Sequence, residues 1–162
     1  MGPLPSRKVK RSYDTAIVFL RGYPGVGKRT VGSALARLID AVLLDNAWIH
    51  GVLLEPFGWA GIAPLPHVWD RVPPIRHALL GVLEDLAPAS NSYVVTNAVE
   101  DDQSSAEHYD TIKSLADRDG SLFLAAQRDC DIDVQVSRIA NPAALRCARA
   151  RTRRAIAGTA RT

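Results

Sequence analysis

The stretch at residues 22–30 reads Gly22-Tyr23-Pro24-Gly25-Val26-Gly27-Lys28-Arg29-Thr30. The run before it, Ala16-Ile17-Val18-Phe19-Leu20, is short, apolar and β-branched, which predicts a parallel strand buried on both faces. After it, apolar residues recur at i, i+4, i+7 and i+8, namely Val31, Leu35, Leu38 and Ile39. This spacing predicts one face of a helix. The glycine-rich stretch therefore joins a strand to a helix.

A turn of this kind is suited to binding phosphate. Glycines let the backbone wrap closely around a phosphate chain, and the N–H groups at a helix start favour anions. Lys28 would reach the β- and γ-phosphates, and a nearby hydroxyl would help to hold Mg²⁺. We therefore interpret the stretch as a P-loop that binds ATP with Mg²⁺ through Gly22, Pro24, Gly25, Val26, Gly27, Lys28, Arg29 and Thr30. The alternative is a glycine-rich turn that merely joins the two elements.

The P-loop departs from the strict pattern at one position. That pattern places Ser or Thr directly after the lysine, whereas this chain has Arg29 there and Thr30 one place later. Thr30 is thus the predicted metal-linked hydroxyl.

The rest of the chain alternates strands and helices. Further strands are predicted at 41–44, 93–96 and 121–125, and helices at 105–118 and from Pro74, the latter with an apolar face of Ile75, Leu79, Val82, Leu83 and Leu86. Residues 132–139 fit either a strand or a helix. The order predicts an α/β fold, a P-loop NTPase-like three-layer architecture with a central parallel sheet of four to five strands.

The pattern Gly-x-Pro-Gly-x-Gly-Lys-x-Thr resembles the P-loop of adenylate-kinase-like small-molecule kinases. Leu44-Asp45-Asn46, Trp69 ahead of an arginine-bearing helix, and a late arginine-rich segment resemble small bacterial ATP-binding proteins related to shikimate and nucleoside kinases. The resemblance covers about Thr15 to Arg149 and is specific only in the P-loop. It implies that Asp45 orients an acceptor hydroxyl or a magnesium-bound water, and that Arg138 and Arg146 belong to a lid over the phosphates. A cap for a helix starting at Ala47 is an equal alternative for Asp45.

Other polar and aromatic residues follow the same strand ends. Asn97 stands where related kinases often carry a metal-linked aspartate, which leaves Asp101 or Asp102 as substitutes or as ordinary solvated residues. Arg71 and Arg76 could hold an anionic substrate, although a solvated helix face is the favoured interpretation. The aromatic residues Trp48, Phe57, Trp59 and Trp69 are expected to pack in the core rather than stack on an acceptor, and the four histidines to be structural or on the surface.

The charge of +3 is unevenly distributed. Four cations precede Asp14 and seven arginines follow Asp133, which leaves nine Lys and Arg against 17 Asp and Glu in between, a net of −8. We expect a flexible basic leader at 1–13, one kinase-like domain at 14–151 and a basic tail at 152–162. Clustered arginines at both ends keep nucleic acid as a less favoured partner.

Two cysteines, Cys130 and Cys147, are too few for a disulfide framework, and no apolar run is long enough to span a bilayer. We therefore expect a cytoplasmic enzyme that transfers phosphate from ATP to a small-molecule acceptor. The alternatives are an ATP-binding protein or slow NTPase without kinase activity, favoured by Arg29, Asn97 and the lack of a strand-like run after residue 148, and a nucleic-acid-associated P-loop module.

Overall fold

The computed structural model describes residues 13–54, 56, 67–99 and 103–140. These residues form one parallel sheet in the order β2-β3-β1-β4, with β1 at Ala16–Gly22, β2 at Ala41–Asp45, β3 at Ser92–Ala98 and β4 at Leu122–Gln127. The helices are α1 (Lys28–Leu38), α2 (Ala47–Leu54), α3 (Val72–Leu86), α4 (Gln103–Arg118) and α5 (Ile132–Ala140), and the short 3-10 helix η2 (Trp69–Arg71) precedes α3. The predicted α/β fold is confirmed, and the ambiguous segment at 132–139 is helical.

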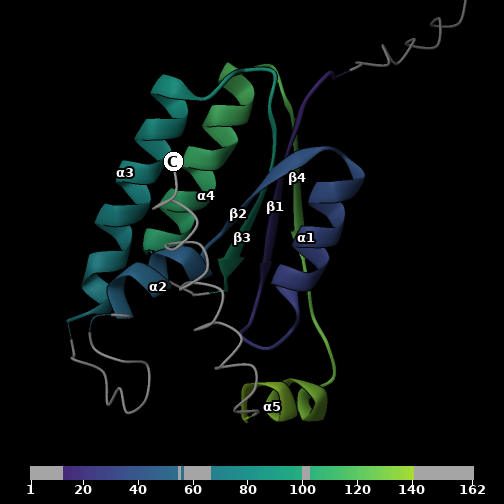
Figure 1. Ribbon diagram of the computed structural model, residues 1–162, viewed down its shortest axis with the longest axis vertical. Coiled ribbons are helices and arrows are strands. Elements are labelled where there is room, and N and C mark those ends of the chain that lie inside the picture. The colour runs from purple at the N-terminus through teal and green to yellow at the C-terminus, as the bar shows by residue number, and fades with distance from the viewer. Residues whose placement is uncertain (1–12, 55, 57–66, 100–102, 141–162) are drawn as a thin grey trace, which may run out of the picture.

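The sheet lies between two helical layers (Figure 1). Because side chains alternate along a strand, Ile17 and Phe19 pack on the α3–α4 side, whereas Val18 packs against Ala36 of α1 on the other. β1 is central and its residues 17–20 are all buried. The turn that follows β1 leads directly into α1, and α5 lies at this same end of the sheet.

The buried face of α1 differs from the predicted one. Val31 and Leu38 are 39% and 82% exposed, and the fully buried residues are Gly32 and Ala36. A Cβ on Gly32 would lie 3.1 Å from both Leu43 Cδ1 and Thr96 Cγ2. The helix therefore approaches the sheet along its small residues. Leu35 and Ile39 of the predicted face pack beside them, whereas Val31 and Leu38 are turned outward.

α3 buries only part of the face that was predicted. It begins at Val72, two residues before Pro74, and buries Val72, Arg76 and Leu80, while Val82 and Leu86 are exposed. These three buried residues follow the i, i+4 row of a helix. Of the predicted face, Leu79 and Leu83 are partly buried, and Leu83 packs on the core. The spacing of apolar residues alone did not predict the most buried row, because one of its members is an arginine.

Candidate functional site

The turn between β1 and α1 has the backbone that its glycines predict. Gly25 and Gly27 have φ angles of 83° and 90°, a region that side chains with a Cβ rarely adopt. Val26 between them is fully buried and anchors the turn. Gly27 caps α1 without a side chain, so the first amides of the helix face the loop and are suited to an anion.

Lys28 lies folded into this loop. Its Nζ donates hydrogen bonds to the carbonyl oxygens of Gly22, at 2.5 Å, and Tyr23, at 2.9 Å. Burial lowers the pKa of Lys28, and the nearby carboxylate of Asp45 opposes that effect. The ammonium group is thus held where a phosphate chain would enter, by neutral partners that a phosphate could replace.

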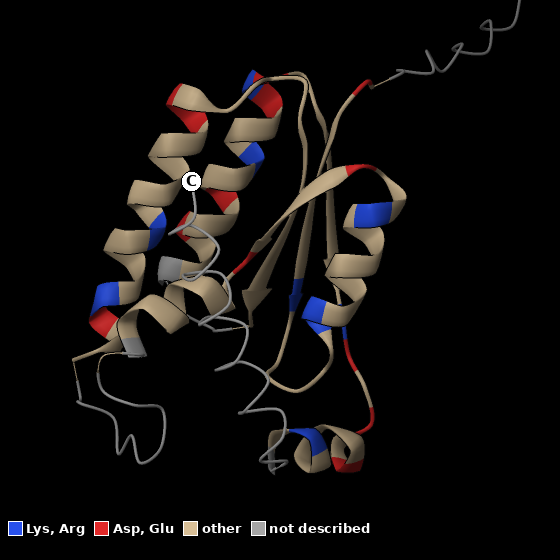
Figure 2. Ribbon diagram, in the orientation of Figure 1, with Lys and Arg blue, Asp and Glu red and all other residues tan. Residues whose placement is uncertain are grey.

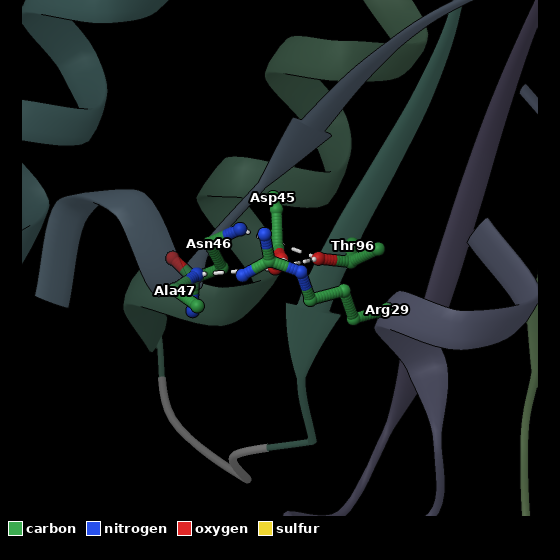
Figure 3. Close-up of polar contacts among 5 residues, drawn as sticks. All are labelled: Arg29, Asp45, Asn46, Ala47 and Thr96. Carbon is green, nitrogen blue, oxygen red and sulfur yellow. Dashed lines mark hydrogen bonds and ion pairs between the residues drawn. The ribbon is translucent and has the colours of Figure 1, made fainter. Parts of the chain in front are cut away.

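Asp45 closes β2 and is almost fully buried. Its Oδ1 accepts hydrogen bonds from the Thr96 hydroxyl at 2.8 Å and from the Ala47 amide at 3.2 Å, as Figure 3 shows. The second bond holds the start of α2, as the capping alternative predicts. Oδ2 lies 3.3 Å from Nε of Arg29, which reaches over from α1. Asp45 therefore supports α2 and also contacts the P-loop.

The charges gather at the carboxyl-terminal edge of the sheet. Basic positions in the first turn of α1 lie across from the acidic position that ends β2 (Figure 2). In parallel sheets this edge is where ligands bind. The predicted loop residues and Asp45 are therefore brought together in one place.

α5 contacts the loop through two side-chain hydrogen bonds. Gln135 Nε2 donates to the Pro24 carbonyl at 2.8 Å, and Arg138 donates to the Gly25 carbonyl at 3.3 Å. Arg138 is thus placed at the P-loop, whereas Arg146 lies outside the described residues. Thr30 is exposed on the first turn of α1.

Solved structures of other proteins are similar to this fold. A protein from Chloroflexus aurantiacus J-10-fl, provisionally described as a kinase, matches with a TM-score of 0.56 at 20% identity, over 78% of this chain and 64% of that one. The fold is therefore P-loop kinase-like. Shikimate kinase from Acinetobacter baumannii, solved with shikimate, gives a TM-score of 0.47 at 16% identity, over 80% of this chain and 65% of the enzyme. This chain thus spans slightly less than two thirds of either protein. No protein-family model matches the sequence, and no curated protein does so.

A cavity of about 30 Å³ lies beside Asp45, between α2, α3 and α4. Apolar side chains form most of its wall, and Asn46, Arg76 and His108 add polar groups. Arg76 is 6% exposed and donates to Asn46 Oδ1 at 3.5 Å, so the prediction of a solvated residue is wrong for it. Arg71 is exposed, as predicted. Arg76 is buried because its position falls on the sheet-facing row of α3.

Two histidines near this cavity are held neutral. Burial and the charge of Arg76 lower the pKa of His108 to about 3. The same two causes lower the pKa of His50, and Lys28 adds to them while Asp45 opposes them. The His108 ring packs edge-on against Phe19, with centroids 5.6 Å apart, which fits the structural role predicted for it. Arg76 is therefore positively charged, whereas the two histidines near it are neutral.

The expected core packing of the tryptophans is wrong for the two that the structure describes. Trp48 and Trp69 are 49% and 44% exposed. Trp48 contributes to the cavity wall, and Trp69 contacts the His50 ring edge-on at a centroid distance of 5.3 Å. A tryptophan ring can remain at the protein surface because it combines an apolar body with a polar N–H group.

Asn97 lies within β3, one residue before its end, and is 3% exposed. Its Oδ1 is buried and has no hydrogen-bond partner among the described residues. The aspartates considered as its substitutes, Asp101 and Asp102, fall outside those residues, as do Phe57 and Trp59.

The P-loop residues fit a triphosphate: the glycine backbone, the open amides of α1 and the Lys28 ammonium face one place. For Mg²⁺ the chain offers the exposed Thr30 hydroxyl, which would bind it together with phosphate oxygens and water. Nowhere in the described ranges do three or more His, Cys, Asp or Glu side chains gather as metal ligands. The carboxylate of Asp45, the nearest acidic group, is paired with Arg29.

Sequence reasoning missed Thr96 and Asn46 as parts of the site. Thr96 is 2% exposed. Its hydroxyl accepts a hydrogen bond from the backbone N–H of Asn46 at 3.2 Å and donates one to Asp45. A hydroxyl residue near the carboxyl end of an otherwise apolar strand is the signal that could have identified it, since a buried hydroxyl needs a partner.

Proposed function

We propose that this chain is an ATP-dependent phosphotransferase that moves the γ-phosphate of ATP to a hydroxyl group of a small molecule, with Mg²⁺ as cofactor. The observation that carries the proposal is the placement of the Lys28 ammonium and the buried Asp45 carboxylate on one edge of the sheet. Phosphoryl transfer needs mainly positioning and charge neutralisation, which this arrangement offers.

The side chains have distinct roles in this proposal. The loop amides and Lys28 hold the phosphates, Thr30 binds the metal, and Asp45 orients the acceptor hydroxyl and accepts its proton. Bound ATP would supply the phosphoryl group. Arg138 on α5, together with Arg146, would stabilise the charge that develops during transfer.

The test is a screen for phosphate transfer from labelled ATP to nucleosides, sugars, shikimate, and aminoglycoside or phenicol antibiotics. Transfer to one acceptor, reduced about 100-fold or more by Asp45→Asn with little change in the affinity for ATP in excess Mg²⁺, would support the proposal. Clear ATP binding without acceptor-dependent turnover would instead favour an ATP-binding protein or slow NTPase. The Arg29–Asp45 ion pair specifically favours that second candidate, because it occupies the carboxylate.

The proposal also covers the extent of the domain and the role of the basic tail. The kinase-like domain spans 14–151 and works in the cytoplasm, so deleting 152–162 should leave turnover intact. None of the described helices is both long and apolar enough to cross a bilayer. Loss of tight, salt-sensitive RNA or DNA binding on that deletion would make the tail a nucleic-acid arm.

A further inference from the structure

Arg29 is the residue at which this P-loop departs from its pattern, and the structure gives it a specific contact. Its Nε lies 3.3 Å from Oδ2 of Asp45. The Arg29 side chain is 37% exposed, whereas that of Asp45 is 5% exposed. The pair therefore joins the solvent-facing loop to a buried carboxylate.

The two oxygens of Asp45 have different surroundings. Oδ1 accepts two hydrogen bonds, from the Thr96 hydroxyl and from the Ala47 backbone amide. Oδ2 is buried and has no hydrogen bond among the described residues, and its ion pair with Arg29 is the contact that balances its charge. A buried carboxylate without such a partner is costly. Arg29 thus holds Oδ2 towards the P-loop.

Arg29 also places a second cation immediately after Lys28. A phosphate chain in this loop would meet two positive side chains from consecutive residues of α1. In the strict pattern this position carries a hydroxyl that binds the metal. An arginine cannot bind a metal cation, but its guanidinium can bind phosphate oxygens directly.

We infer that Arg29 is a positioning and specificity residue that orients Asp45 and balances triphosphate charge, so that nucleotide binding depends less on Mg²⁺ than in P-loops with a hydroxyl there. The inference rests on the proposed triphosphate binding at the loop, and not on transfer to an acceptor. It makes Arg29 a residue whose removal changes the metal dependence of binding and not simply its strength.

The test compares ATP affinity, by calorimetry, in excess Mg²⁺ and in EDTA. For the full-length wild type, we expect the two dissociation constants to differ by less than about tenfold. Arg29→Ser, which restores the hydroxyl directly after the lysine, should weaken metal-free binding at least about tenfold while largely keeping binding in Mg²⁺. Arg29→Lys, which keeps the charge, should stay close to wild type in both conditions.

Two further variants separate the charge from the new hydroxyl. Arg29→Ala should lose metal-free affinity as Arg29→Ser does, without the gain that a hydroxyl gives in Mg²⁺. Asp45→Asn should tighten metal-free binding, because the guanidinium loses its competitor for phosphate. In the double variant Arg29→Ala/Asp45→Asn that gain should disappear.

The outcomes distinguish this inference from the proposed function. Equal Mg²⁺ dependence in wild type and Arg29→Ser, with both folded by circular dichroism, would overturn the role of Arg29 and leave the P-loop assignment standing. Failure of the wild type to bind ATP in either condition would overturn the proposed function, and this inference with it.

Discussion

At the scale of single residues, the site depends on how one carboxylate is shared. Asp45 uses one oxygen for Thr96 and the start of α2, and turns the other towards Arg29. Lys28 is also fixed by its neighbours, since its ammonium donates hydrogen bonds to two carbonyl oxygens of the loop. Both side chains are kept in place by neighbours that do not need a ligand to be present.

Thr30 gives a prediction at this scale. Thr30→Val removes the predicted metal-linked hydroxyl from an exposed position and keeps the side-chain shape. Binding of Mg-ATP should weaken several-fold, while binding of metal-free ATP stays unchanged. Calorimetry in Mg²⁺ and in EDTA measures both. Thr30→Ser retains the hydroxyl and should behave as wild type, whereas equal losses in the two conditions would mean that Thr30 acts through packing.

At the scale of elements, α5 and the P-loop stabilise one another. Besides the hydrogen bonds from Gln135 and Arg138, the helix lies so close that a Cβ on Gly25 would be 2.9 Å from Ile139 Cγ1 and 3.0 Å from the Gln135 carbonyl oxygen. The loop conformation and the position of α5 therefore depend on the same glycine.

Gly25→Ala tests this dependence. The substitution meets both a φ of 83° and the crowding from α5, so the free energy of unfolding should fall by about 1–2 kcal/mol and ATP affinity should decrease. The matched control is Gly81→Ala within α3, where a Cβ would meet no atom within 4 Å. That variant should gain about 0.5–1 kcal/mol. Urea unfolding measures both, and an unchanged Gly25→Ala protein would contradict the proposed contact.

The elements also show what the sequence pattern could predict. The positions of the strands, the turn and α4 followed from runs of apolar residues and from punctuation by glycine and proline. The buried faces of α1 and α3 followed only in part, because Gly32 allows a close approach to the sheet and Arg76 is buried in an otherwise apolar row. Apolar periodicity detects neither effect. Segment 132–139 fitted both periods, and in the structure it is a helix whose apolar side chains are exposed.

At the scale of the whole molecule, topology assembles the site. β2 and β3 are neighbours in the sheet, so Asp45 and Thr96 meet although 51 positions separate them in sequence. The P-loop and Asp45 were predicted from the sequence, since each follows a strand. Their joining through Arg29 was not, because it depends on the length and direction of a side chain across two elements.

A prediction on pH belongs to this scale, since His108 of α4 is buried against Phe19 of the sheet. Its pKa is about 3 in the folded chain and near 6.5 when unfolded. Below pH 6.5 the unfolded state binds a proton that the folded state does not, so stability falls as the pH is lowered towards 3. Between pH 7.5 and 5.5 the wild type should lose about 1 kcal/mol more than His108→Gln in urea unfolding. The exposed control His77→Gln should keep the wild-type slope, and equal slopes for all three would contradict the prediction.

The most direct test of the central claim, that the loop at 22–30 binds the phosphates of ATP, is a calorimetric titration of wild type and Lys28→Ala with ATP in Mg²⁺. Lys28→Ala removes the charge aimed at the β- and γ-phosphates and leaves the apolar core untouched. The wild type should bind, and the variant, with unchanged circular dichroism and melting temperature, should show no measurable binding. Equal affinity of the two folded proteins for ATP would contradict the P-loop assignment.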